Sequence, residues 1–327
     1  MIYKNTLKNW SKRIAKALLF IILVYLIYNQ ILKSLNWKEQ FSEIQSKFNK
    51  DSYFLIFFII AFSFLNLSLD ALRWRMLLKH IYKVTFFQSL KAVFSGLSIA
   101  IITPNKVGDF LGRIIYLPSN KKTSGALSTL IGSFAQLTIT YFLGILGLLY
   151  FMFNYPTWWS YYLLIGGCIL FFTILYFYFN LPKFKKYEYR FRNIRLLKVL
   201  LWTLGRYNKI QLAQVLLLSL MRIIVYNLQF IIIAYILGIE FYLLDAIFLT
   251  PLMFWLISLI PSFLLADIGV RAYVSQLIFV QSGIISQDLA IMTASIIIWL
   301  LNIILPALLG LIPLGHEAFF SKNGEKK

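Results

Sequence analysis

The chain has 327 residues, of which 60% are hydrophobic, 18% aromatic and 13% charged. A soluble globular domain carries about 25% charged residues, so this composition excludes an ordinary soluble enzyme and indicates a protein with several membrane spans. The net charge of +20 does not indicate a nucleic-acid partner, because the basic residues flank apolar runs. That placement is typical of cytoplasmic loops in membrane proteins, for which anionic lipid headgroups are the expected counter-charge.

Cysteine and histidine are too rare to suggest chemistry that depends on them. The single cysteine, Cys168, lies in an apolar run, so the chain can form no internal disulfide. His80 and His316 fit no zinc or haem spacing, and no Gly-rich nucleotide-binding run is present. The sequence has no nucleophile and base in a recognisable pattern. We therefore expect that the protein uses no cofactor and is not an enzyme.

The N-terminal part predicts a retained membrane span. Residues 1–16 are basic and residues 17–32 are apolar, but no small-residue cleavage site follows as it would in a signal peptide. Residues 37–50 place aromatic and apolar side chains at helical spacing among Lys and Glu, which is typical of an interfacial helix.

Residues 53–69 predict the second span, and its end is marked by Asp70, Arg73 and Arg75. We expect this end to be cytoplasmic and the two arginines to anchor it at the interface, with recruitment of lipid headgroups as the alternative. Residues 84–103 form a third apolar run, interrupted by Lys91. Further spans are predicted over residues 125–153 and 158–179.

Residues 181–209 form a strongly basic connector, which we expect to be cytoplasmic. Residues 210–237 then predict another span with Arg222 inside it. The apolar run 244–261 and a last span over residues 285–313 complete the chain. The fold class is therefore an all-α polytopic membrane protein of about eight hydrophobic segments in one transmembrane domain, residues 1–327.

A polar break occurs twice. In residues 104–113 and again in residues 261–271, a proline ends an apolar run and an aspartate follows, with an arginine four positions further on. The pairs are Asp109 with Arg113 and Asp267 with Arg271. At this spacing both side chains lie on one face of a helix, and ionisable residues in membrane segments are costly unless they face protein or water.

The distribution of basic loops predicts how these breaks are oriented. Most of the 32 lysines and arginines fall in residues 1–16, 71–83, 119–124, 181–209 and 316–327. If these segments and both termini are cytoplasmic, residues 84–118 form a re-entrant hairpin from the cytoplasmic side and residues 244–281 one from the outer side. The halves 17–153 and 158–313 are then inverted repeats, an arrangement that places substrate near the membrane midplane in transporters.

Three short motifs resemble the lysylphosphatidylglycerol synthase transmembrane, or flippase-like, family. Residues 72–78 are similar to its Leu-Arg-Trp-x-x-Leu-Leu signature, residues 104–113 to its Pro-x-x-x-Gly-(Glu or Asp)-x-x-x-Arg element, and residues 261–271 to its late Gly-x-Arg-Glu element. The late element departs from the pattern, because residues 265–267 replace paired glycines and Ala272 replaces the glutamate.

The resemblance implies a polytopic domain of the bacterial cytoplasmic membrane that moves a lipid between leaflets. The expected substrate is an anionic phospholipid or polyprenyl phosphate. The alternative is an accessory subunit without transport of its own, which presents lipid to a separate lipid-modifying enzyme or glycosyltransferase. From this sequence we expect no counterpart of the synthase domain found in aminoacyl-phosphatidylglycerol synthases.

The polar breaks supply the candidate headgroup-binding residues. Arg113 and Arg271 are expected to bind lipid phosphate, since a planar guanidinium can donate two hydrogen bonds to it. Asp109 and Asp267 would orient them; the alternative is that both pairs are structural salt bridges. Further candidates are Arg222, Lys91 and Lys106. Arg222 could instead pair with Asp245 or extend to an interface, and the long side chain of Lys106 could reach water.

Overall fold

The computed structural model describes residues 42, 50–101, 103, 107–191, 193–240, 242–260, 264–280, 283 and 288–320. Within them the chain is helical and has no strand, which confirms the all-α class. The predicted span 17–32 and most of the interfacial stretch 37–50 lie outside the described residues. The count of eight hydrophobic segments therefore stays a prediction.

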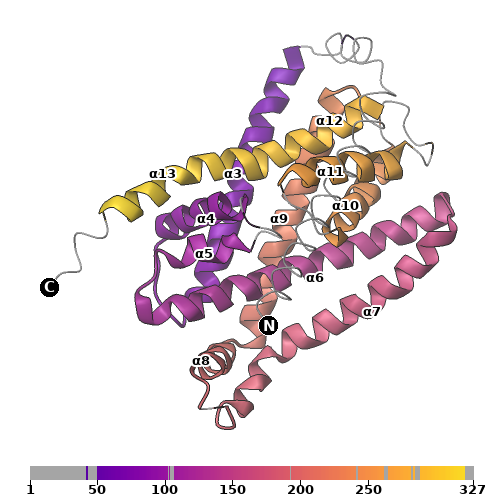
Figure 1. The fold of residues 1–327 in the computed structure, drawn as a ribbon. Coiled ribbons are helices and arrows are strands. Elements are labelled where there is room, and N and C mark those ends of the chain that lie inside the picture. Colours follow the sequence, from indigo (N-terminus) through magenta and orange to yellow (C-terminus); the bar gives the residue numbers. More distant parts are fainter. Residues whose placement is uncertain are drawn as a thin grey trace, which may run out of the picture.

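Two long helices form the centre of the fold. Helix α3 (Lys50–Leu78) packs along helix α9 (Lys209–Ile236), as Figure 1 shows. At 1.5 Å per residue α3 is about 44 Å long, enough to cross the apolar layer of a bilayer. The prediction that this span ends at Leu69 was wrong, because the helix continues through Asp70, Arg73 and Arg75 to Leu78.

The first polar break lies in a helical hairpin. Helix α4 (Phe86–Ile101) packs against the short helix α5 (Gly108–Ile114). The two backbones approach closely at Gly96 and Gly112, where an added Cβ would overlap Asp109 and Ser95 respectively. Glycine permits this approach because it has no side chain, and the close packing holds α5 in place beside α3 and α6.

The second polar break lies in another hairpin, formed by α10 (Leu243–Leu259) and α11 (Leu264–Phe279). It precedes α12 (Asp288–Trp299), the π-helical turn η5 (Leu300–Ile304) and α13 (Leu305–Phe320). The hairpins differ in where their first arms pack, since α4 packs on α13 and α10 packs on α6, although α5 also contacts α6. In Figure 1 they lie on different sides of the α3–α9 pair.

The remaining helices cover one side of this centre. The turn η3 (Ser119–Lys121) leads into α6 (Lys122–Asn154), which packs on α7 (Trp158–Asn180). The buried Trp255 of α10 fills the space over Gly144 and Gly167, which joins these helices. The basic connector is itself structured, with the 3-10 turn η4 (Leu181–Tyr187) and the amphipathic helix α8 (Arg195–Leu204).

Five helical stretches of the described chain are long and apolar enough to cross a membrane. They are Ser52–Leu78, Ser119–Asn154, Trp158–Tyr187, Lys209–Ile236 and Leu289–Leu314. Helices α4 and α10 are apolar but shorter, as expected for arms of a hairpin that does not cross the bilayer alone. The chain thus has the architecture of a multi-pass membrane protein.

Candidate functional site

A cavity of about 760 Å³ lies between the two hairpins and the long helices. Its wall includes side chains from α3, α4, α5, α6, α9, α10, α11, α12 and η5. Both polar breaks therefore contribute to one space, although they lie about half the chain apart. The volume falls in the range of about 300–1,000 Å³ that is usual for ligand sites.

The carboxylate of Asp70 is the centre of the charged cluster in this cavity. It accepts a hydrogen bond from Arg73 Nη2 at 2.6 Å and from Arg113 Nη2 at 2.8 Å, and it lies 3.1 Å from Arg222 Nη1. The Asp70 side chain is only 5% exposed and that of Arg113 4% exposed. Three arginines from α3, α5 and α9 are thus held against one buried carboxylate.

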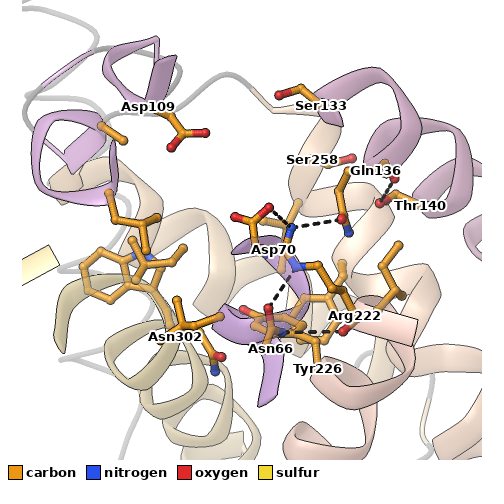
Figure 2. Close-up of a pocket in the computed structure, with 18 of the residues that line it drawn as sticks. Asn66, Asp70, Asp109, Ser133, Gln136, Thr140, Arg222, Tyr226, Ser258 and Asn302 are labelled. Carbon is orange, nitrogen blue, oxygen red and sulfur yellow. Dashed lines mark hydrogen bonds and ion pairs between the residues drawn. The ribbon is translucent and has the colours of Figure 1, made fainter. Parts of the chain in front are cut away.

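Neutral side chains satisfy donors that Asp70 leaves free. Gln136 Oε1 accepts from Arg73 Nη1 at 2.8 Å and from Arg222 Nη1 at 3.3 Å. Asn66 Oδ1 accepts from Arg222 Nε at 3.1 Å. Figure 2 shows Arg222 lying between Asn66, Asp70 and Gln136. A buried guanidinium needs such partners because an unsatisfied polar group costs free energy away from water.

Arg113 joins the first hairpin to the cluster. Its Nε donates to Asp109 Oδ1 at 2.8 Å, one helical turn earlier in α5, while its Nη2 donates to Asp70 of α3. Asp109 is the more accessible of the two acids, with its side chain 23% exposed. The bridge between two carboxylates uses the fixed fork of the guanidinium group.

Arg271 of the second hairpin is less completely paired. Its Nε donates to Asp267 Oδ2 at 3.3 Å, and both residues line the cavity. Arg271 is 5% exposed, and no partner lies within hydrogen-bond distance of its Nη1 among the described residues. Buried guanidinium donors are normally satisfied, so this unpartnered nitrogen distinguishes Arg271 from the other three arginines of the cavity.

The charges lining the cavity do not cancel. Among the described residues of its wall, the charged side chains are four arginines and three aspartates, which leaves one surplus positive charge. They are Arg73, Arg113, Arg222, Arg271, Asp70, Asp109 and Asp267. Each aspartate lies against at least one guanidinium. The cavity is therefore electrostatically suited to an anion.

Most of the candidate residues from the sequence meet here, and two of the described ones, Lys91 and Arg75, do not. Lys91 and Arg75 are exposed and outside the cavity wall, so the structure does not place them with the other candidates. Lys106 lies outside the described residues, as do Pro104 and Pro261 at the start of the breaks.

One expectation and one alternative need correction. Arg73 is not an interface anchor, because its side chain is buried in the Asp70 cluster, where its charge is compensated. Arg222 does not pair with Asp245, whose carboxylate instead accepts hydrogen bonds from Tyr150 at 2.9 Å and Tyr155 at 3.3 Å.

The sequence reasoning missed the residue at the centre of the cluster. Asp70 and Arg73 form an i,i+3 ion pair at the end of an apolar run, the same kind of signal as the i,i+4 pairs of the breaks. Gln136, Asn66 and Asn302 carry no comparable signal, because a lone amide in an apolar run has no spacing pattern. Asn302 projects from the π-helical turn η5, a feature often found at functional sites.

Within the described residues, no three side chains of His, Cys, Asp or Glu gather as they would to hold a metal ion.

Comparison with known proteins supports the resemblance seen in the motifs. No curated protein and no solved structure matches the chain. The family described as "Lysylphosphatidylglycerol synthase TM region" matches residues 13–310, which include all seven charged residues of the cavity. The chain therefore belongs to the lysylphosphatidylglycerol synthase transmembrane-region family.

Proposed function

We propose that this protein binds the phosphate of an anionic lipid, a phospholipid or a polyprenyl phosphate, in the cavity and moves the lipid between leaflets. The observation that carries the proposal is that Arg113 of the first hairpin and Arg271 of the second line one cavity. Arginine suits phosphate because its planar group can donate two parallel hydrogen bonds. No catalytic step is part of the proposal.

The aspartates have a defined part in this proposal. Asp70, Asp109 and Asp267 hold the guanidinium groups that would otherwise be buried without counter-charge. A lipid phosphate would take over some of the hydrogen bonds that the arginines donate to these aspartates, and the aspartates would recover them when the lipid leaves. Removing one partner from a buried ion pair costs about 3–5 kcal/mol, so this exchange keeps the cluster stable through a transport cycle.

The proposed movement uses the two hairpins as inverted repeats. The contact pattern supports this arrangement, since α4 packs on α13 while α10 packs on α6, and α3 pairs with α9. Under this proposal α3 to α6 correspond to α9 to α13, and each hairpin leads from one leaflet to the shared cavity. Rocking of one half against the other would then expose the cavity to each side in turn.

A source of energy for directed movement can come from the membrane itself. The membrane potential acts on a charged ligand with about 2.3 kcal/mol per elementary charge per 100 mV. An anionic headgroup that crosses with its charge would be driven by this potential. Exchange down a concentration difference needs no coupling to an energy source.

The experiment is leaflet exchange in liposomes containing the purified protein and a fluorescent anionic phospholipid. Wild-type protein should accelerate exchange over protein-free liposomes, and Arg113→Gln and Arg271→Gln should each reduce it at equal reconstitution. Arg190→Gln is the matched control, because it removes an exposed arginine that is not part of the cavity wall. Exchange at the protein-free rate would contradict transport; if the lipid still bound, the accessory role, lipid presentation to a separate enzyme, would take its place.

A further inference from the structure

The basic connector between α7 and α9 carries an exposed face that has no part in the cavity. We infer that this face docks on a bilayer surface that contains anionic lipid, and that docking holds the first hairpin, α4 and α5, in its position. None of the connector residues lines the cavity, so the inference does not depend on the proposed transport.

The docking face is formed by exposed residues of η4 and α8, two elements that pack against each other. It combines lysines with accessible apolar side chains and consists of Lys183, Lys185, Lys186, Tyr187, Leu196 and Lys198. Residues 181–209 hold nine lysines and arginines against one acid, Glu188. Each basic residue near an anionic bilayer surface strengthens the attraction about fivefold, so the charge of this segment suits such a surface.

The position of the connector favours a bilayer as the partner. The helical stretches Trp158–Tyr187 and Lys209–Ile236 are both long and apolar enough to cross a membrane, and the connector joins their ends. In Figure 1, α8 lies near the end of α7 where the connector begins. Leu196 is 65% exposed. An interfacial helix inserts such apolar side chains below the headgroups while its lysines reach the lipid phosphates.

The opposite side of α8 is fixed to the rest of the fold. Leu201, Thr203 and Leu204 are buried. Thr203 Oγ1 donates a hydrogen bond to Ser124 Oγ at 2.9 Å, near the start of α6. Because α8 is packed and hydrogen-bonded in this way, a force that acts on its exposed face is transmitted to the helices beneath it.

The end of α8 is tied to the point where the first hairpin begins. Arg206 Nη1 donates to the carbonyl of His80 at 3.3 Å, and the hydroxyl of Tyr207 donates to the carbonyl of Leu77 at 3.2 Å. These carbonyls belong to the last turn of α3 and to the turn that follows it. The last carbonyls of a helix have no partner within the helix, so the connector supplies donors there.

The same end of α8 is tied to the point where the first hairpin ends. The Trp202 ring centroid lies 4.1 Å from Arg206 Cζ and 5.7 Å from Lys121 Nζ, which are cation–π distances. Lys121 belongs to η3, the turn that follows α5 and leads into α6. Both ends of the hairpin therefore contact one short segment, and fixing that segment on the bilayer fixes the base of the hairpin.

The first experiment measures docking of the full chain in nanodiscs of phosphatidylcholine, with or without added phosphatidylglycerol. An NBD fluorophore is attached to Leu196→Cys in a Cys168→Ser background, since Cys168 is the single cysteine. We expect phosphatidylglycerol to shift the emission to shorter wavelength and about 1 M salt, with a screening length of about 3 Å, to reverse the shift. The control is the same label on Tyr242→Cys, an exposed site beyond the other end of α9, whose emission should not depend on phosphatidylglycerol.

A triple variant tests the role of charge in docking. Lys183→Gln, Lys186→Gln and Lys198→Gln together should weaken the attraction roughly a hundredfold, at about fivefold for each charge. The label should then emit alike in both nanodiscs, and thermal unfolding checks that the variant is folded. Wild-type emission that ignores phosphatidylglycerol would overturn the docking. A response to soluble polyglutamate in its place would assign the face to an acidic protein and would also overturn it.

The second experiment is hydrogen–deuterium exchange of residues 86–114 in the same nanodiscs. We expect phosphatidylglycerol to slow exchange in wild type and to have no such effect in the triple variant. Trp202→Leu should keep the emission shift but lose the slower exchange, because the ring no longer joins Arg206 and Lys121. Docking without slower exchange in wild type would overturn the hold on the hairpin. Slowing that persists in the triple variant would place the lipid elsewhere, for example in the cavity, and would overturn it too.

Discussion

Replacing Asp70 by asparagine is the most informative test of the charged cluster. The substitution keeps the size of the side chain but removes the counter-charge of Arg73, Arg113 and Arg222, which lie 2.6, 2.8 and 3.1 Å from the carboxylate. Because the Asp70 and Arg113 side chains are about 95% buried, water can replace little of this interaction. Breaking a buried ion pair by removing one partner costs about 3–5 kcal/mol.

Thermal unfolding in detergent, followed by tryptophan fluorescence, measures the effect. One kcal/mol shifts the Tm of a domain of about 150–250 residues by roughly 2–4 °C, so Asp70→Asn should unfold roughly 6–20 °C below wild type. Asp109→Asn is the matched control. Its side chain is 23% exposed, and among the described residues its ion pair is with Arg113, so its loss should cost about 1 kcal/mol.

A second substitution should restore part of the stability. Arg222→Gln in the Asp70→Asn background removes one of the three guanidinium groups that lost their partner, and Gln can still accept or donate hydrogen bonds to Asn66 and Gln136. We therefore expect the double variant to unfold at a higher temperature than Asp70→Asn alone. A Tm for Asp70→Asn within 2 °C of that for Asp109→Asn would refute the view that Asp70 is the centre of the cluster.

Three other substitutions test the packing around the cavity. Gly147→Ala should destabilise the protein by about 1–3 kcal/mol, because the added Cβ would overlap the carbonyl oxygen of Phe248 on α10. The control Gly166→Ala should change the Tm little, because nothing lies near the added Cβ. A Tm for Gly147→Ala equal to that for Gly166→Ala would disprove the close contact of α6 and α10. Arg113→Lys should lower both the Tm and the rate of leaflet exchange, since lysine has no rigid fork with which to bridge Asp70 and Asp109; wild-type values would show that the bridge has no role. Tyr207→Phe should cost about 1–2 kcal/mol in the same unfolding assay, because the buried hydroxyl contacts Ser128 at 2.9 Å and donates to the carbonyl of Leu77 at 3.2 Å. The control Tyr162→Phe alters an exposed ring and should unfold as wild type does.

The sequence alone predicted the helices and the two breaks well. Apolar runs of about 20 residues predict membrane helices because backbone hydrogen bonds must be satisfied internally in lipid. The predicted spans 125–153, 158–179 and 210–237 agree with α6, α7 and α9 to within three residues at each end. The aspartate–arginine spacing likewise identified both ion pairs of the breaks.

What the sequence could not predict depends on contacts between distant segments. Asp70 and Arg73 looked like the polar end of a span, because local sequence does not show that Arg113 and Arg222 will approach them. These ion pairs compensate the charges and allow α3 to continue as a buried helix to Leu78. Arg222 was ambiguous for the same reason, since its partner is 152 positions away in the chain.

The central claim is that the cavity between the hairpins holds the headgroup of an anionic lipid. Photo-crosslinking with phosphatidylglycerol that carries a diazirine on its headgroup tests it most directly, with the labelled peptides identified by mass spectrometry. We expect labelling of α5 (Gly108–Ile114) and α11 (Leu264–Phe279), competed by unlabelled phosphatidylglycerol and lost in Arg271→Gln. Labelling confined to the outer surface of α7 (Trp158–Asn180) or to the basic connector, and unchanged in Arg271→Gln, would contradict it.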